Sequence, residues 1–158
     1  MTRRPPIQGL GHFPQAFQTA SGSWNIHASC VTLGSLCFIV SGPASAGKTT
    51  LCHRFVDEGA KWVADDRLVM AAGTSSLDLS CPPKLHGLVE LPREGPVEVG
   101  GMVSVQVPYG NVIWIDLGGR HQTPHLKAIS VFAHSVRCVQ IPPRPDHDVR
   151  ALGRMATL

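Results

Sequence analysis

The sequence lacks a long apolar run. Its longest strongly apolar stretch, residues 36–40 (LCFIV), is far shorter than the ~20 residues that a helix needs to cross a bilayer. The two arginines near the start are not followed by the apolar segment of a secretory signal. We therefore expect a cytoplasmic protein that has no membrane partner.

The sequence also lacks a strong excess of charge of either sign. It has 14 Lys and Arg against 11 Asp and Glu, a formal net charge of +3, and the basic residues are spread along the chain. Nucleic-acid-binding domains usually gather their basic residues on one face or along one helix. We expect no nucleic-acid partner, whereas a modest positive surface still suits an acidic protein partner.

No two cysteines have the C-x-x-C spacing that is typical of metal and redox sites. Most of the five cysteines lie among apolar residues, where a free thiol behaves as a small buried hydrophobe. They are Cys30, Cys37, Cys52, Cys81 and Cys138. We expect all of them to be reduced.

The length and composition indicate one domain. A chain of 158 residues, 43% of them hydrophobic, is long enough for one core of ordinary size. Residues 1–22 are rich in Pro, Gly, Gln, Ser and Thr and show no apolar period, which predicts a flexible arm. Residues 23–158 are expected to form the domain.

The first part of that domain has the pattern of strand, strand and helix. Residues 24–34 alternate apolar and polar side chains, which predicts a strand with one buried face. Residues 36–40 predict a second strand, so the two form a hairpin. Residues 51–56 have the spacing of a helix, and Gly59 occupies the position of a C-terminal cap.

The remaining patterns complete an α/β chain. The sequence predicts short strands at 61–66, 67–71, 102–108 and 111–116, a loop at 74–83, and a closing helix within 145–158 that is capped by Asp146 and buries Val149 and Leu152.

A phosphate-binding motif lies between the hairpin and the helix. Gly42, Gly47, Lys48 and Thr49 satisfy G-x-x-x-x-G-K-[ST] in the order strand, loop, helix, and that context makes the motif specific. The expected nucleotide-binding residues are Gly42, Pro43, Ala44, Ser45, Ala46, Gly47, Lys48, Thr49 and Thr50. Backbone N–H groups and Lys48 would hold the phosphates of ATP, and the Thr49 hydroxyl would bind Mg²⁺. The alternative is a small-residue turn beside an exposed lysine.

Two positions could supply an acidic residue to such a site. Asp116 closes the apolar strand VIWID, as the acidic residue does in ordinary P-loop ATPases. Asp65 and Asp66 follow the strand after the predicted helix. Adjacent residues on a strand point to opposite faces, so at most one of this pair faces the phosphates unless the chain turns there. A carboxylate in that place could accept a proton from a hydroxyl.

The stretch from residue 26 to residue 68 resembles the catalytic domain of HPr kinase/phosphorylase. The resemblance rests on His27, the motif that ends in Lys48 and Thr49, and the pair Asp65 and Asp66. It implies a P-loop domain of the HPr kinase and PEP carboxykinase-like type, with a mixed central sheet and flanking helices. It also implies an ATP- and Mg²⁺-dependent kinase that phosphorylates a serine of the phosphocarrier protein HPr and so regulates carbon metabolism.

The resemblance further implies roles for individual residues. Asp66, beside Asp65, would accept the seryl proton in the kinase direction and return it in phosphate-driven removal, with His27 close by. Lys48 would bind the phosphates. Chains of this short, single-domain type would assemble as homo-oligomers.

The chain departs from the family pattern after Pro82 and Pro83. Glu90 stands at the position of a Mg²⁺-binding glutamate, but the family's Arg-Gly turn is replaced by Leu91 and Pro92, and a proline restricts the loop. The catalytic arginines of the family have three candidate positions here, which are Arg93, Arg120 and Arg144. These departures fall on parts used for the phosphorylase direction, so the expected activity is that of a kinase.

Two other functions are open at this point. The altered segment 90–96 (ELPREGP) also suits a nucleotide-binding regulator with weakened catalysis. An ordinary P-loop ATPase or small-molecule kinase would use Asp116 instead of Asp66.

Overall fold

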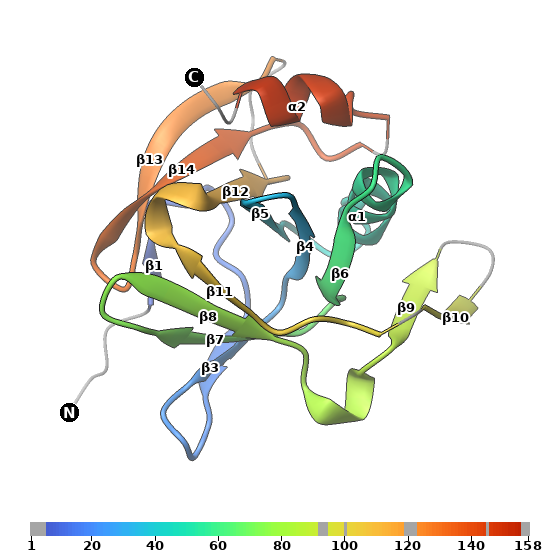
Figure 1. Cartoon of the computed structure of the whole chain (residues 1–158). Helices are drawn as coiled ribbons and strands as arrows, with labels where there is room; N and C mark the ends of the chain where they lie inside the picture. The colour runs from blue at the N-terminus through green and yellow to red at the C-terminus, as the bar shows by residue number, and fades with distance from the viewer. Residues whose placement is uncertain (1–5, 92–94, 100, 119–122, 145, 156–158) are drawn as a thin grey trace.

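The computed structural model describes residues 6–91, 95–99, 101–118, 123–144 and 146–155. In this part of the chain, a large curled sheet is covered by two helices on one face and by a smaller sheet on the other (Figure 1).

The central sheet is mixed and seven-stranded in the described residues. Its strands, in spatial order, are β1 (Ile7–Gln8), β13 (His125–Val131), β14 (His134–Gln140), β12 (Val112–Asp116), β5 (Leu36–Ser41), β4 (Ser29–Leu33) and β6 (Lys61–Ala64). Strand β12 pairs in parallel with both β5 and β14, and the other pairs are antiparallel. Every residue of β12 is buried, as is usual for a parallel strand that is covered on both faces.

A second sheet packs below the central one in Figure 1 and is entirely antiparallel. Its order is β11 (Val105–Pro108), β8 (Ser76–Ser80), β7 (Leu68–Ala72), β3 (Trp24–Ile26) and β2 (Ala16–Gln18). A separate hairpin of β9 (Leu88–Leu91) and β10 (Gly95–Glu98) extends beside the first helix. Two short 3₁₀ turns, η1 (Pro83–Leu85) and η2 (Tyr109–Asn111), precede β9 and β12.

The alternation of side chains along β12 divides the core into two clusters. Val112 and Trp114 face the second sheet, while Ile113 and Ile115 face the helices α1 (Lys48–Asp57) and α2 (Val149–Met155). Ala46, in the loop after β5, packs in the same cluster as the two helices, so this loop lies on the helical face of the sheet.

The predicted hairpin and helix are confirmed, with one difference. Residues 24–34 do not form one strand, because β3 belongs to the second sheet and β4 to the central sheet. Ile26, Ala28 and Cys30 are fully buried as expected. Gly59 ends α1 with a φ of 105°, a left-handed conformation that glycine adopts without strain.

Three local predictions are corrected. Residues 6–22 of the expected arm are ordered, since β1 pairs with β13 and β2 pairs with β3. Residues 76–80, expected to be a loop, form β8. The closing helix is capped by Asp148, whose Oδ1 accepts N–H bonds from Arg150 and Ala151, and not by Asp146. Val149 and Leu152 are buried as predicted.

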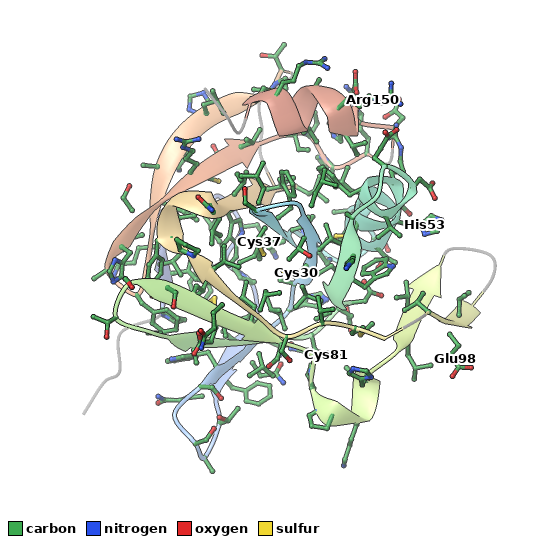
Figure 2. All side chains as sticks on the ribbon, in the orientation of Figure 1. Cys30, Cys37, His53, Cys81, Glu98 and Arg150 are labelled. Carbon is green, nitrogen blue, oxygen red and sulfur yellow. The ribbon has the colours of Figure 1, made fainter. Side chains whose placement is uncertain are left out.

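All five cysteines are free, and four of them are buried. Cys30 and Cys37 lie side by side in the centre of the molecule (Figure 2), with their sulfur atoms 3.3 Å apart. Burial raises the pKa of the Cys30 and Cys52 thiols, so these side chains are neutral parts of the core. Within the described residues, neither helix combines the length and the apolar character that crossing a membrane requires.

The ordered amino-terminal segment gives a first testable prediction. Ile7 is 1% exposed and packs in the core next to β13, so Ile7→Ala should lower the free energy of unfolding by about 2–5 kcal/mol in chemical denaturation. Gln8→Ala, at the exposed neighbouring position of the same strand, should change it by less than about 0.5 kcal/mol. Equal effects of the two substitutions would show that β1 does not dock on the sheet.

Candidate functional site

The site is built around the loop between β5 and α1. Gly47, immediately before the helix, has a φ of 99°, and Ser45 has a φ of 64°. Gly42 lies so close to Leu117 that an added Cβ would stand 2.8 Å from the Cβ of Leu117. A glycine is therefore needed where the loop leaves the sheet. The first backbone N–H groups of α1 have no partner within the helix, and they give this end a partial positive charge.

A cavity of about 510 Å³ opens over this loop. Its lining consists of the loop and first turn of α1, one histidine, one aspartate and part of the segment after β14. These residues are His27, Ala44, Ser45, Ala46, Gly47, Lys48, Thr49, Thr50, Asp66, Pro143 and Arg144. The volume lies in the range of small-molecule sites, about 300–1,000 Å³.

Lys48 is buried at the base of the loop. Its Nζ donates hydrogen bonds to the carbonyl oxygens of Gly42, at 3.1 Å, and Pro43, at 2.9 Å. Burial lowers the pKa of the Lys48 ammonium, and the negative charges of Asp66 and Asp65 oppose this effect. Neither carbonyl carries a formal charge, so the desolvated Lys48 ammonium is available to interact with an anion in the cavity.

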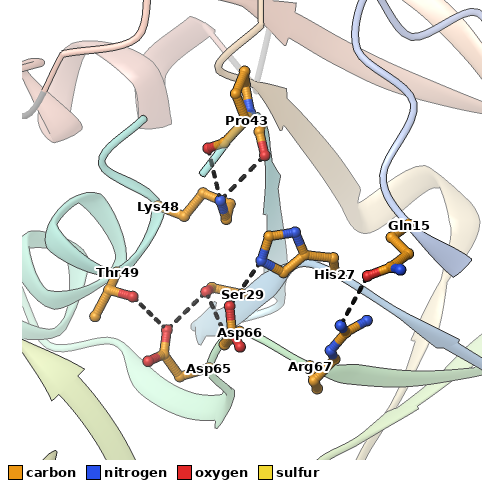
Figure 3. A network of polar contacts seen from close by, with 10 residues as sticks. Gln15, His27, Ser29, Pro43, Lys48, Thr49, Asp65, Asp66 and Arg67 are labelled. Atoms are coloured by element: carbon orange, nitrogen blue, oxygen red, sulfur yellow. Dashed lines mark hydrogen bonds and ion pairs between the residues drawn. The ribbon is translucent and has the colours of Figure 1, made fainter. Parts of the chain in front are cut away.

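Asp65 is buried and joins three elements through one oxygen. Its Oδ1 accepts a hydrogen bond from the Thr49 hydroxyl at the start of α1, at 2.8 Å, and one from the Ser29 hydroxyl of β4, at 2.7 Å. Asp65 itself follows the last residue of β6. Its carboxylate therefore fixes the end of β6 to the start of the helix (Figure 3).

Asp66 points in a different direction because the chain turns at this residue. Its φ is 65°, and the N–H of Arg67 bonds to the carbonyl oxygen of Asp65 at 2.7 Å. The Asp66 side chain is 61% exposed, and its Oδ1 lies 2.8 Å from His27 Nε2. The turn thus directs the Asp65 side chain toward Thr49 and Ser29, and the Asp66 side chain toward His27 at the cavity (Figure 3).

Asp116, the other acidic candidate, is used elsewhere. It is fully buried and accepts hydrogen bonds from the N–H of Gly11, the N–H of Gly118 and the side-chain amide of Gln140. It does not line the cavity. Its hydrogen bonds hold the amino-terminal segment against the ends of β12 and β14, so Asp116 stabilises the fold.

The candidate arginines and Glu90 are only partly within the described residues. Arg144 lines the cavity, and its guanidinium lies 3.3 Å from Asp146. Arg93, Arg120 and the side chain of Glu90 lie outside the described residues. Their expected roles therefore stay predictions.

Ser29 was not among the residues predicted from the sequence. Its position two residues after His27 places it on the same face in a strand pattern, which is a signal that it could reach the same site. That face was expected to be polar and solvated, but Ser29 is fully buried.

The donor set suits a triphosphate and a hard cation. Backbone N–H groups at a helix N-terminus together with a lysine are the usual ligands of phosphates. A threonine hydroxyl and a carboxylate supply oxygen atoms, which Mg²⁺ prefers, and Mg²⁺ usually keeps several waters and needs only one or two protein ligands. Thr49 and Asp65, whose oxygens are 2.8 Å apart, satisfy that requirement.

The fold of this protein is similar to that of a solved structure. No protein-family model matches the chain, and no curated protein matches its sequence. The solved structure of the HPr(Ser) kinase/phosphatase from Coxiella burnetii is similar, with a TM-score of 0.68 and 18% identity over 84% of this chain and 87% of that chain. The expected mixed central sheet with flanking helices is confirmed, and in the described part it has the fold of this HPr(Ser) kinase/phosphatase. The assignment of the loop after β5 as a P-loop stays a prediction.

The burial of Lys48 predicts a dependence of stability on pH. Since its pKa is lowered by folding, the unfolded chain binds more protons between this lowered pKa and the ordinary lysine value, and stability increases with pH over that window. Lys48→Met should remove this contribution, so its unfolding free energy should increase less than that of the wild type as pH approaches about 10. Lys61→Met, at an exposed position, controls for the loss of a lysine. Parallel curves for wild type and Lys48→Met would contradict the prediction.

The hydrogen bonds of Asp116 predict a structural role for this residue. Asp116→Asn places an amide NH₂ against N–H donors, so it should lower the unfolding free energy by about 1–3 kcal/mol. Asp146→Asn, whose side chain is 77% exposed in the wild type, should have little effect. If the folded Asp116→Asn variant kept full stability but failed to bind nucleotide, Asp116 would belong to the site after all.

Proposed function

We propose that the protein is an ATP-dependent protein serine kinase that acts on the phosphocarrier protein HPr. The observation that carries the proposal is that one cavity brings a loop of helix-terminal N–H groups, the buried Lys48 and the exposed carboxylate of Asp66 together. The structural likeness to an HPr(Ser) kinase/phosphatase supports the choice of HPr as acceptor.

The loop and Lys48 bind the phosphates of ATP in this proposal. Lys48 exchanges its bonds to the Gly42 and Pro43 carbonyls for bonds to phosphate oxygens, which are charged and so interact more strongly with an ammonium. The positive φ of Gly47 supports the turn that leads into the helix N-terminus. Such positioning and charge neutralisation supply most of the catalysis in phosphoryl transfer.

The Thr49 hydroxyl and the Asp65 carboxylate would hold Mg²⁺, with Glu90 as a further ligand that the resemblance implies. Bound Mg²⁺ supplies neutralisation of charge on the phosphates. The contribution of the chain is to keep the Thr49 and Asp65 oxygens together at the start of α1.

Asp66 would accept the proton of the seryl hydroxyl. Its carboxylate is on the cavity rim and 61% exposed, so a side chain on the surface of another protein can approach it. His27 contacts Asp66 Oδ1 and holds the carboxylate in place. Arg144, at the same rim, would place a positive charge near the transferred group.

Replacement of Asp66 tests the role of this carboxylate. Asp66→Asn should reduce phosphoryl transfer from Mg-ATP to HPr by about 10²- to 10⁴-fold, because the amide cannot accept the proton. ATP affinity, measured by calorimetry, should change little, because Asp66 does not donate to phosphates. Transfer is measured as serine phosphorylation of purified HPr by mass spectrometry.

Asp57→Asn is the matched control, since Asp57 is at the far end of α1 with a side chain that is 66% exposed. It should transfer at the wild-type rate. Tight ATP binding by a wild-type protein that phosphorylates no serine of HPr would reject the proposal and favour a nucleotide-binding regulator. Full transfer by Asp66→Asn would reject the assignment of Asp66.

A further inference from the structure

Ser29 is a polar residue in an apolar position. It is the first residue of β4, it is 0% exposed, and its neighbours Ala28 and Cys30 are fully buried as well. A buried hydroxyl is unfavourable unless it forms hydrogen bonds. A serine can therefore be accommodated there only because its hydroxyl has hydrogen-bond partners.

The Ser29 hydroxyl connects the two aspartates of the site. It donates to Asp65 Oδ1 at 2.7 Å and accepts the backbone N–H of Asp66 at 3.1 Å. The first contact is of the charge-assisted kind, which is about twice as strong as a neutral hydrogen bond. The pairing of β4 with β6 shifts register between Val31 and Cys30 and ends where Cys30 pairs with Ala64. The Ser29 side chain therefore receives an N–H that lies beyond the end of the ladder.

The backbone at Asp66 needs such support. A φ of 65° is in the left-handed region, which is uncommon for a residue with a side chain and which persists where surrounding contacts hold it. On one side, the N–H of Arg67 bonds to the carbonyl oxygen of Asp65. On the other, Ser29 holds the N–H of Asp66 itself. Without Ser29, the Asp66 N–H would lose this acceptor.

We infer that Ser29 is a positioning residue that holds the turn at Asp65–Asp66, so that Asp65 faces Thr49 while Asp66 faces His27 and the cavity. Ser29 does not line the cavity, so it acts through the two carboxylates and not on a ligand directly. That Ser29 holds this turn does not depend on the proposed function. The effect of Ser29 on catalysis does rest on the proposed function.

Amide hydrogen exchange followed by NMR tests the structural part. In the wild-type protein, the Asp66 N–H should exchange at least about tenfold more slowly than in the unfolded chain, because Ser29 Oγ accepts it. In Ser29→Ala this protection should be lost, while amides within β4 and β5 keep theirs. Ser29→Thr retains a hydroxyl and should restore the protection.

Ser41→Ala is the matched control. Ser41 is also fully buried, on the neighbouring strand β5, but its hydroxyl accepts the indole N–H of Trp114 and does not contact the aspartates. Its loss should leave the Asp66 amide protected. If Ser29→Ala does not fold, the exchange rate of the Asp66 amide in the wild type and in Ser29→Thr still tests the inference. An Asp66 amide that exchanges at the unfolded rate in the wild type, or one that stays protected in folded Ser29→Ala, overturns the inference.

Kinetics tests the consequence for the reaction. Ser29→Ala should lower the rate of transfer to HPr about 10- to 100-fold, as is typical when a residue that orients a ligand is removed. Its affinity for Mg²⁺-free ADP should be unchanged, since Lys48 and the loop are intact. If the wild type transfers nothing, the proposed function fails while the exchange result stands. If the wild type is active and Ser29→Ala equals it, the positioning role fails.

Discussion

The rest of the site depends on the hydrogen bonds that the buried carboxylate of Asp65 accepts. A buried charge is unfavourable unless it is hydrogen-bonded, and Asp65 meets this requirement with the hydroxyls of Thr49 and Ser29. Because these hydroxyls belong to α1 and β4, the carboxylate ties the helix, the hairpin and the end of β6 to one point. The turn that follows then presents Asp66 to the cavity.

Two features of the site reduce the stability of the fold. Lys48 is desolvated without a carboxylate in hydrogen-bonding contact among the described residues, and Asp66 has a left-handed backbone. A stable fold does not need either feature, and strained or desolvated groups are common where a protein binds or reacts with a ligand. Asp116 is the contrasting case, because three hydrogen bonds to its buried carboxylate connect structural segments.

Local signals in the sequence predicted the phosphate-loop region and several single strands, but not every local hairpin. The loop motif, strand β5, helix α1 and its glycine cap depend on residues close together in the chain, and the structure has them where the pattern placed them. Strand β1 was missed because its partner β13 lies far along the chain. Strands β2, β8, β9, β10, β13 and β14 were missed although each pairs with a neighbouring segment, because their short or polar-interrupted sequences give a weaker strand signal than β5 or β12. The turn at Asp66 and the burial of Ser29 could not be predicted either, since both result from the packing of β4 against β6.

The central claim is that the loop after β5 holds a triphosphate whose terminal phosphate lies between Lys48 and Asp66. A crystal structure of the protein with Mg²⁺ and a non-hydrolysable ATP analogue tests it most directly. We expect the Lys48 Nζ to leave the Gly42 and Pro43 carbonyls for phosphate oxygens, with Asp66 at the rim nearest the terminal phosphate. Phosphates bound away from the loop, or an Asp66 carboxylate on the opposite side of the molecule from them, would contradict the account.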